Sequence, residues 1–380
     1  MTFPPVFIAG AGLAGSTVAR LLAEKGARVT LYEARDHVAG NCYDARCPQT
    51  GVRVHQYGPH IFHTADEAVW AFVNRFARFI PYHHRVFTTA RGQVWSLPVN
   101  LLTLSQFRGQ AMTPQEARSW LATLASGEAK AAQNLEARGL QLMGRALYDT
   151  FFRGYTEKQW GCPATELPAA ILNRLPFRFD FNDGYFSHPY QAMPENGYTE
   201  LIMNMLNHPG ITVITGSQVT PSLARDMQKQ GHLFWTGPLD AYFSHDAGRL
   251  RYRTLDFMRE VVPADWQGCA VMNYADPDVS WTRITDHARL SPWEHHEMTV
   301  IYREFSREAG PQDIPYYPVR LAGENAVLAH YEARARQESN VTFLGRLGTC
   351  RYLDMDATIA QAMQAVQTFM FSQTGKDNCS

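Results

Sequence analysis

The chain begins with a short apolar run that leads into a glycine-rich segment. Residues 6–9 are apolar, GAGLAG follows, and then Val18, Leu21 and Leu22 fall on one face of a helical pattern. A second apolar run, ARVTLYEA, comes directly after Gly26. This pattern predicts a strand, a turn, a helix that ends at Gly26, and a second strand.

The glycine spacing gives this unit a phosphate-binding character. Gly10 permits a tight turn, Gly12 lets a pyrophosphate approach the backbone, and Gly15 lets the helix pack closely on the strand. The free N–H groups of the helix N-terminus then face the phosphates. Glu33 follows Gly15 by 18 residues and is placed to accept hydrogen bonds from ribose hydroxyls. The sequence therefore predicts a Rossmann-like domain that binds an adenine dinucleotide.

The middle of the chain changes from helical to β-prone patterns. Apolar positions at helical spacing predict a helical insert over about 97–172, in which one helix opens on Thr113 and Pro114. Short β-prone runs over 177–190 and 242–317 predict an antiparallel sheet. Between them, GITVITGSQVT and GHLFWTGPLDAYF predict strands that return to the dinucleotide domain.

The C-terminal part predicts a strand, a Gly-Arg turn and a long helix. Asp354 or Asp356 is the expected N-cap of this helix, and its expected apolar stripe is Ile359, Met363, Val366 and Met370. We therefore predict an α/β fold with a discontinuous Rossmann-like domain and two inserted domains. The expected parts are the Rossmann-like domain (1–80, 195–240 and 330–380), a helical domain (98–172) and an antiparallel sheet domain (81–97, 173–194 and 241–329).

Composition and charge narrow the range of partners. The chain has 35 basic and 36 acidic residues and no run of like charges, so nothing favours nucleic acid or an anionic membrane surface. No stretch approaches the ~20 apolar residues of a membrane-spanning helix. Six cysteines lack metal-ligand spacing, His60 and His63 have no third ligand nearby in the sequence, and the start lacks the pattern of a signal peptide. We predict a cytoplasmic protein with free thiols and no metal site.

The segment FFRGYTEKQWG, residues 151–161, combines four aromatic rings with charged side chains. A core segment would exclude the charges, because burying unpaired charge is costly. A plain surface loop would not carry so many rings. We interpret the segment as a pocket wall that stacks on a flat polar ligand, with its charges at the pocket rim. A helix end with its aromatic side chains turned inward remains the alternative for any single ring.

Seven stretches of the chain, taken in order, carry a family resemblance. They are GAGLAG, YGPHIFHT, FFRGYTEKQWG, RLPFRFDFNDGYF, WTRITDH, PYYPV and GRLGTCRYLDMD. From residue 6 to about residue 370 the chain resembles the bacterial UDP-galactopyranose mutases. The resemblance implies an FAD-dependent isomerase that interconverts UDP-galactopyranose and UDP-galactofuranose without net redox change. Reduced FAD would be the active form, with a covalent adduct between flavin N5 and the anomeric carbon of the sugar. A homodimer and a reductant such as NAD(P)H are further implications.

The same resemblance assigns residues to roles. Catalytic roles fall to His60 and to two arginines that would hold the diphosphate, Arg174 in a mobile lid and Arg283. Substrate binding, with Tyr155 and Trp160 stacking on uracil, falls to Phe151, Phe152, Tyr155, Thr156, Trp160, Arg174, Tyr185, Arg283, Tyr317, Tyr352, Asp354 and His84. Cofactor binding falls to Gly10, Gly12, Leu13, Gly15, Glu33, Ala34, Arg35, Gly40, Asn41, Tyr57, Gly58, Pro59, His60, Ile61, Val219, Arg346, Tyr352, Leu353, Asp354 and Met355.

Two positions depart from the family pattern. Ala39 stands where the family usually has glycine, and we expect it to adopt a negative φ. Cys350 stands where tyrosine is common, and we expect it beside the flavin. His84 occupies a position that varies between Asn and His. The alternatives are a mutase for UDP-N-acetylgalactosamine, a redox flavoenzyme of the amine-oxidase type, a glycosyltransferase with a metal on Asp354 and Asp356, and a non-catalytic nucleotide-binding protein.

Overall fold

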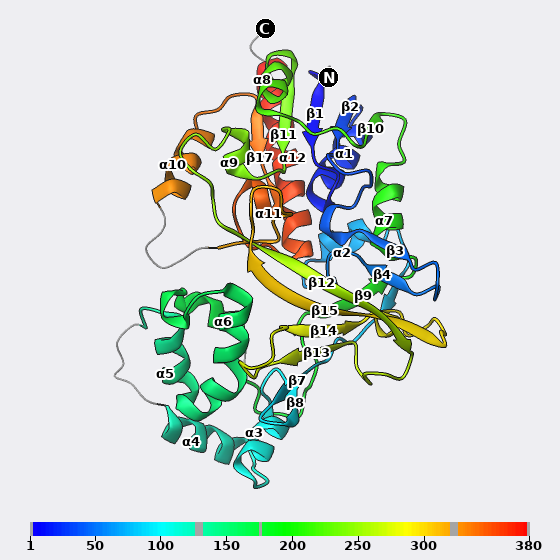
Figure 1. Ribbon diagram of the computed structural model, residues 1–380. Helices are drawn as coiled ribbons and strands as arrows, with labels where there is room; N and C mark the ends of the chain where they lie inside the picture. The colour runs from blue at the N-terminus through cyan, green and yellow to red at the C-terminus, as the bar shows by residue number, and fades with distance from the viewer. Residues whose placement is uncertain (1–2, 126–131, 175–176, 320–325, 378–380) are drawn as a thin grey trace.

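A five-stranded parallel sheet forms the first layer of the molecule. The computed structural model describes residues 3–125, 132–174, 177–319 and 326–377 (Figure 1). The strand order is β10 (Ile211–Ile214), β2 (Val29–Tyr32), β1 (Val6–Ala9), β11 (His232–Trp235) and β17 (Val341–Phe343). All neighbours run parallel, so strands predicted from distant parts of the sequence do return to one sheet.

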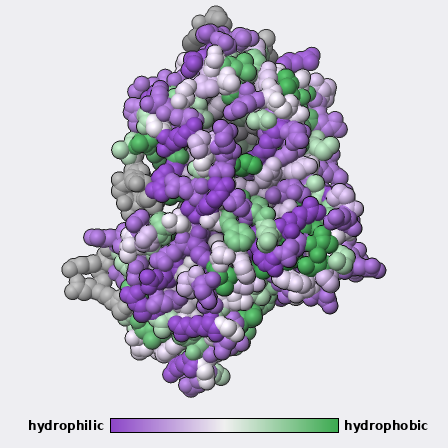
Figure 2. Space-filling view, viewed as in Figure 1, coloured by the Kyte–Doolittle hydropathy of each residue, from purple (hydrophilic) through white to green (hydrophobic). Residues whose placement is uncertain are grey.

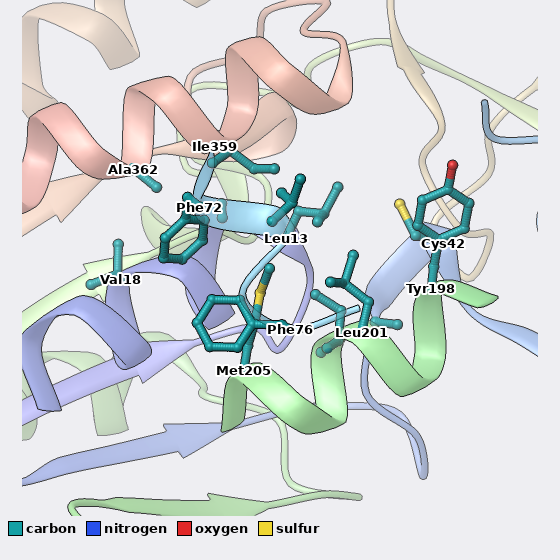
Figure 3. Close-up of a cluster of buried hydrophobic side chains, with 14 of the residues drawn as sticks. Leu13, Val18, Cys42, Phe72, Phe76, Tyr198, Leu201, Met205, Ile359 and Ala362 are labelled. Atoms are coloured by element: carbon teal, nitrogen blue, oxygen red, sulfur yellow. The ribbon is translucent and has the colours of Figure 1, made fainter. Parts of the chain in front are cut away.

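Helices cover this sheet and bury its apolar residues. They are α1 (Leu13–Glu24), α7 (Gly197–Leu206), α8 (Pro221–Gln230), α9 (Leu239–Tyr242), α10 (Ala326–Ala335), α11 (Gly345–Gly348) and α12 (Met355–Asp377). Figure 3 shows buried side chains of α1, α7 and α12 pointing toward one another, together with two phenylalanines from α2 (Glu67–Val73) and the residues after it. The core therefore joins the glycine-rich turn at the start of the chain to the helix at its end.

The glycine-rich turn accepts no larger residue at two of its positions. Gly10 has φ +109°, and a Cβ there would lie 2.1 Å from the Thr236 hydroxyl oxygen. A Cβ on Gly15 would lie 1.9 Å from the Gly10 carbonyl oxygen. Because a real Cβ does not approach other atoms so closely, glycine is required for the tight turn and for the helix packing.

The second layer is a seven-stranded sheet below the parallel sheet (Figure 1). The predicted antiparallel pairing is confirmed except at one position, because β13 and β7 run parallel. The strand order is β16 (Tyr317–Pro318), β12 (Tyr252–Pro263), β15 (Met298–Glu308), β14 (Arg283–Asp286), β13 (Val271–Tyr274), β7 (Val86–Ala90) and β8 (Gln93–Leu97).

Two small sheets connect the layers. One pairs β3 (Asp44–Arg46) with β4 (Arg53–His55), and the other has the order β5 (Phe62–Thr64), β9 (Tyr190–Pro194), β6 (Phe79–Pro81). The prediction of strands across 177–190 is wrong, because strand structure begins only at Tyr190. Before it, the Asp180 side chain accepts the N–H of Asn182, whose side chain accepts that of Gly184, at 2.9 Å each. These local bonds take donors that a strand would need.

The predicted helical insert lies at the far end of the molecule from the chain termini (Figure 1). It consists of α3 (Leu101–Arg108), α4 (Pro114–Leu124), α5 (Leu135–Tyr148), the π-helical turn η2 (Asp149–Arg153), α6 (Gly154–Trp160) and the 3₁₀ turns η3 (Ala164–Glu166) and η4 (Ala169–Arg174). At the predicted start of α4, Thr113 and Glu116 form a capping box, each side chain bonding the other residue's backbone N–H.

The C-terminal helix differs from its prediction in detail. It begins at Met355, so Asp354 precedes it and Asp356 lies in its first turn. Its fully buried face is Ile359, Ala362, Val366 and Phe369, and Met363 and Met370 lie partly buried at the border. Both stripes follow the helical repeat, and Phe369 is buried instead of Met370 because its ring packs against the rings of His232 and Phe234 in β11.

The visible surface is mostly hydrophilic, with single apolar residues scattered over it (Figure 2). Within the described ranges, no helix combines the length and the apolar character needed to cross a membrane.

Two buried histidines should make the folded protein less stable in acid. His55 and His287 are 2% and 0% exposed, and the backbone N–H of His55 donates to the ring nitrogen Nδ1 of His287 at 3.3 Å. Burial lowers the pKa of His55 to about 3 and that of His287 well below its ordinary value. The unfolded chain takes up these protons near pH 6.5 but the folded chain does not, so each histidine costs on the order of 1 kcal/mol of stability at pH 5.5 and almost nothing at pH 7.5.

We expect His287→Gln to lose less stability than the wild type on acidification. Denaturant unfolding at pH 7.5 and pH 5.5 should give a pH-dependent loss of stability that is smaller in the variant, by on the order of 1 kcal/mol. Replacement of the exposed His330 by glutamine is the matched control and should behave as the wild type does. Equal losses in the wild type and in His287→Gln would contradict the assignment.

Candidate functional site

Two cavities meet between the parallel sheet, the seven-stranded sheet and the helical insert. Their volumes are about 800 Å³ and 580 Å³. The glycine-rich turn lines the first cavity and α6 lines the second. Asn41, His60, Arg346 and Met355 line both, so the cavities adjoin at these residues. One long ligand, or two ligands in contact, can therefore occupy them.

The first cavity contains a fixed acid and a buried donor. Glu33 follows β2, and its carboxylate accepts the N–H of Ala11 at 2.8 Å and that of Arg35 at 3.0 Å. Arg35 donates from Nη2 to Asn41 at 2.8 Å, and its guanidinium lies 4.4 Å from the centre of the Tyr57 ring. Nη1 of Arg35 is buried and has no hydrogen-bond partner among the described residues. This unused donor fits a ligand with phosphate or ribose oxygens.

The expected backbone of Ala39 is wrong. Its φ is +76°, in the left-handed region, rather than negative. The residue is buried, and its N–H donates to the Ala11 carbonyl at 2.9 Å, which holds the segment against the glycine-rich turn. The next residue, Gly40, lies so near the turn that a Cβ would be 3.1 Å from Cα of Gly12. Ala39 therefore carries a backbone strain of about 1 kcal/mol or more that glycine would avoid.

Cys350 also differs from its expectation. It is 2% exposed and belongs to a core cluster that includes Trp235 and Tyr331. It lines neither cavity. Cys350 therefore lies in the core behind the first cavity. Cysteine in place of the family's usual tyrosine does not change the wall of that cavity.

Aromatic side chains of α6 and the preceding turn form one wall of the second cavity. Phe151, Phe152, Tyr155, Thr156 and Trp160 all line it. The π-helical turn η2 widens the helix just before α6 and so changes the direction in which these side chains project. The interpretation of the segment as a pocket wall is consistent with this placement.

The charged side chains of residues 151–161 do not form the predicted pocket rim. Arg153 and Glu157 pair at 3.4 Å and line neither cavity. The Lys158 ammonium donates to the backbone carbonyl oxygens of Tyr274, Asp276, Val279 and Trp281 at 2.7, 2.9, 2.8 and 3.2 Å. Lys158 thus ties α6 to the segment that leads into β14. The sequence did not reveal this role, because the partners are backbone atoms more than 100 residues away.

Arg283 is a cation held in place at the cavity wall. It lies at the start of β14, opposite Glu304 in β15, with 3.1 Å between Nε and the Glu304 carboxylate. Glu304 is 2% exposed and also accepts the Thr282 hydroxyl at 3.2 Å. Burial opposes the charge of Arg283, but Glu304 raises its pKa well above the ordinary value. Both side chains line the second cavity, and Glu304 is a site residue that sequence reasoning missed.

Three residues form a stacked group between the cavities. The rings of Tyr317 and Tyr352 lie 5.7 Å apart at an angle of 14°, and the Arg346 guanidinium lies 4.9 Å from the Tyr352 ring. Arg346 also donates to the Leu353 carbonyl at 2.7 Å. This fixes the chain that leads to the N-terminus of α12, where Met355 lines both cavities.

The histidines of the site are neutral. Nδ1 of His60 bonds the Gly58 carbonyl at 2.9 Å, so this nitrogen carries the proton. The His60 N–H donates to Nδ1 of His55 at 3.1 Å. Burial lowers the pKa of both His60 and His84 to about 3. His63 lines the second cavity beside His188.

The structure brings nearly all the predicted site residues to these cavities. Gly15 lines neither, since it packs the helix on the turn, and the Arg174 side chain lies outside the described part of the structure. The first cavity takes Gly10, Gly12, Leu13, Glu33, Ala34, Arg35, Gly40, Asn41, His60, Val219, Arg346, Leu353 and Met355. The second takes Tyr57, Gly58, Pro59, Ile61, His84, Phe151, Phe152, Tyr155, Thr156, Trp160, Tyr185, Arg283, Tyr317, Tyr352 and Asp354, with Asn41, His60, Arg346 and Met355 shared.

Comparisons with known proteins agree with this arrangement. Residues 8–76 match the NAD(P)-binding Rossmann-like domain, and residues 150–352 match the UDP-galactopyranose mutase family. The chain is 48% identical to a probable UDP-galactopyranose mutase of Klebsiella pneumoniae, over 98% of this chain and 96% of the relative. It is 46% identical to a dTDP-fucopyranose mutase of Escherichia coli, over 96% and 98%.

A solved structure shares the fold. A crystal structure of reduced UDP-galactopyranose mutase superposes with a TM-score of 0.75 at 15% identity, covering 97% of this chain and 94% of that one. The family match covers more than half of the chain, and the relative from Klebsiella pneumoniae is similar along almost its whole length. The chain belongs to the UDP-galactopyranose mutase family.

Proposed function

We propose that this protein is an FAD-dependent isomerase that interconverts UDP-galactopyranose and UDP-galactofuranose. The observation that carries the proposal is the placement of Arg283. It is a permanent cation, fixed by Glu304, in a cavity with an aromatic wall that adjoins a dinucleotide cavity. The cation suits a diphosphate leaving group, the aromatic wall suits a flat base, and the adjoining cavity suits the cofactor.

The residues present fit FAD in the first cavity. The glycine-rich turn leaves room for the pyrophosphate, Glu33 has lone pairs for the ribose, and Arg35 offers a buried donor. The N-terminus of α12 brings its positive end toward the place where the cavities meet. Reduced FAD, when bound there, supplies the nucleophile for the anomeric carbon of the sugar.

The residues of the second cavity hold the substrate. Tyr155 and Trp160 offer ring faces to uracil, and base stacking of this kind is worth about 1–3 kcal/mol per base. Arg283 stabilises the negative charge that grows on UDP as its bond to the sugar breaks. Arg174 is the proposed second cation for this charge. His60, neutral and with Nδ1 bonded to backbone, presents Nε2 as an acceptor beside the reacting groups.

A second candidate substrate is dTDP-fucopyranose. The relative from Escherichia coli that carries this activity in its name is nearly as similar as the one from Klebsiella pneumoniae. The two substrates share a diphosphate, a pyrimidine and a pyranose ring. They differ in the methyl group on the base, the ribose 2′-hydroxyl and the sugar itself, so the fixed cation and the aromatic wall serve both.

Product analysis with three substrates tests the proposal. We expect dithionite-reduced, FAD-loaded protein to convert UDP-galactofuranose to the pyranose with a higher kcat/KM than dTDP-fucofuranose or UDP-N-acetylgalactofuranosamine. Reducing equivalents should not be consumed, and oxidised protein should be inactive. A higher kcat/KM for dTDP-fucofuranose would favour the second candidate. Failure to convert any of them, or consumption of reductant with turnover, would contradict mutase activity.

The remaining assignments extend the proposal. We propose that residues 98–172 form a substrate domain that ends in a mobile lid, with the Rossmann-like and sheet domains divided as the sequence predicts. We also propose a cytoplasmic homodimer that is reduced by NAD(P)H. The family resemblance supports these assignments, and sedimentation analysis and anaerobic titration with NADPH would test the dimer and the reductant.

A further inference from the structure

A cluster of two imidazoles and a carboxylate lies beside the second cavity and has no role in the proposed mechanism. It consists of His63 in β5, His188 just before β9 and Asp356 in the first turn of α12. One ligating atom of each residue lies within 4.8 Å of the other two, and Nδ1 of His63 is 2.8 Å from Nδ1 of His188. The sequence suggested only His60 as a partner for His63, but Nδ1 of His60 bonds the Gly58 carbonyl instead.

Three separate elements hold these side chains in position. Strands β5 and β9 pair with His63 opposite Gln191, and the Gln191 amide donates to the His188 carbonyl at 2.8 Å. The ring of Phe186 stacks on the His63 ring, with 3.7 Å between centroids and an angle of 22°. Helix α12 packs against β5 and brings Asp356 to the same place. The cluster is therefore preorganised rather than a chance meeting of surface side chains.

The local charge favours a cation. Asp354 and Asp356 both act electrostatically on His63, and neither carboxylate forms an ion pair with another described residue. One oxygen of Asp356 accepts the N–H of Ala357 at 2.7 Å, which leaves the other oxygen available. Two imidazoles at close range cannot both be protonated at low cost, but both can bind one metal ion in their neutral form.

We propose that His63, His188 and Asp356 bind one divalent transition-metal ion at the edge of the substrate cavity. Two imidazole nitrogens and one carboxylate oxygen favour Zn²⁺, Cu²⁺ or Ni²⁺ over Mg²⁺ or Ca²⁺, which prefer oxygen ligands. Three protein ligands leave a coordination position open for water or for a substrate oxygen. Since His63 and His188 line the second cavity, a bound ion ties the segment after Tyr185 to α12.

Zinc titration of EDTA-treated, FAD-loaded protein tests the site independently of mutase activity. Calorimetry should show one Zn²⁺ per chain in the wild type and no comparable binding of Mg²⁺. Replacing a residue that only hydrogen-bonds a metal ligand weakens metal binding about 10- to 100-fold. Loss of a ligand itself, in Asp356→Asn or His188→Gln, should therefore weaken zinc binding at least about 100-fold. Replacement of the exposed His295 by glutamine is the matched control and should retain full affinity.

A spectroscopic measurement separates ligation from a structural effect. With Cu²⁺ in place of zinc, electron paramagnetic resonance should show coupling to two imidazole nitrogens in the wild type and to one in His188→Gln. Asp356→Asn is nearly isosteric and keeps the acceptor for Ala357, so it should unfold at the same temperature as metal-free wild type. No binding at millimolar zinc, or binding that both variants retain, would overturn the proposal.

Discussion

Replacing Arg283 by alanine should lower turnover about 100- to 1,000-fold and leave the flavin bound. Removal of one donor that stabilises transition-state charge costs about 3–4 kcal/mol in comparable sites, because the donor acts where water is excluded. Arg283 is such a donor, since Glu304 holds it at the wall of the substrate cavity. Steady-state kinetics with saturating UDP-galactofuranose and the flavin absorbance of the same preparation measure the two effects.

The Arg283 experiment needs a control for stability, since the alanine variant leaves Glu304 buried without its cation. Breaking a buried pair costs about 3–5 kcal/mol, so the melting temperature should fall as well. Arg283→Lys keeps the charge beside Glu304 but loses the planar donor group, and we expect it to stay folded with reduced turnover. Arg225→Ala removes an exposed arginine from α8 and should change neither property. Normal turnover in both Arg283 variants would contradict the assigned role.

Replacing Lys158 by methionine should lower the free energy of unfolding by at least about 3 kcal/mol. The side chain keeps its length, but four backbone carbonyl groups lose a charged donor. The Asp276 carbonyl still accepts the Val279 N–H, and each buried acceptor that is left unsatisfied costs about 1–3 kcal/mol. Methionine is neutral, so the variant avoids the cost of burying an ammonium group, and this offsets part of the loss. Burial lowers the pKa of Lys158 to about 8, so the ammonium remains the main form at pH 7. Denaturant unfolding of the FAD-loaded protein measures the change.

The same variant should raise KM as well, because the loop from Tyr274 to Trp281 leads directly into Arg283. Lys229→Met is the matched control. Lys229 pairs with Asp226 on the surface of α8, with 74% of its side chain exposed, and its loss should cost less than about 1 kcal/mol. Equal stability of the Lys158 and Lys229 variants would show that the four carbonyl contacts contribute little.

The Rossmann-like unit and the aromatic wall were predictable because their causes are local. Gly10 needs a positive φ and Gly15 a close contact within the same turn, so the sequence spacing alone indicates the geometry. The rings of Tyr155 and Trp160 lie on one short helix, and the mixture of rings and charges within that segment indicated a pocket wall. The terminal helix was predicted for the same reason, although its buried face shifted toward Ala362 and Phe369.

Other features depended on contacts between distant segments. The partners of Lys158, the pairing of Arg283 with Glu304, and the meeting of His63 with His188 and Asp356 arise from strand register and helix packing. The segment over 177–190 has the composition of a strand, but its side chains make local turns, and before Tyr190 it forms only an isolated bridge between Gly184 and Arg85.

The sequence by itself therefore determined the parallel dinucleotide unit, the helical insert and the family of the chain. Only the tertiary structure decided which charges face the cavity and which are bound elsewhere. The physical reason is that backbone conformation and periodicity act within a few residues. The partner of a charged side chain, in contrast, depends on which distant backbone and side-chain atoms the folded core brings within hydrogen-bonding distance.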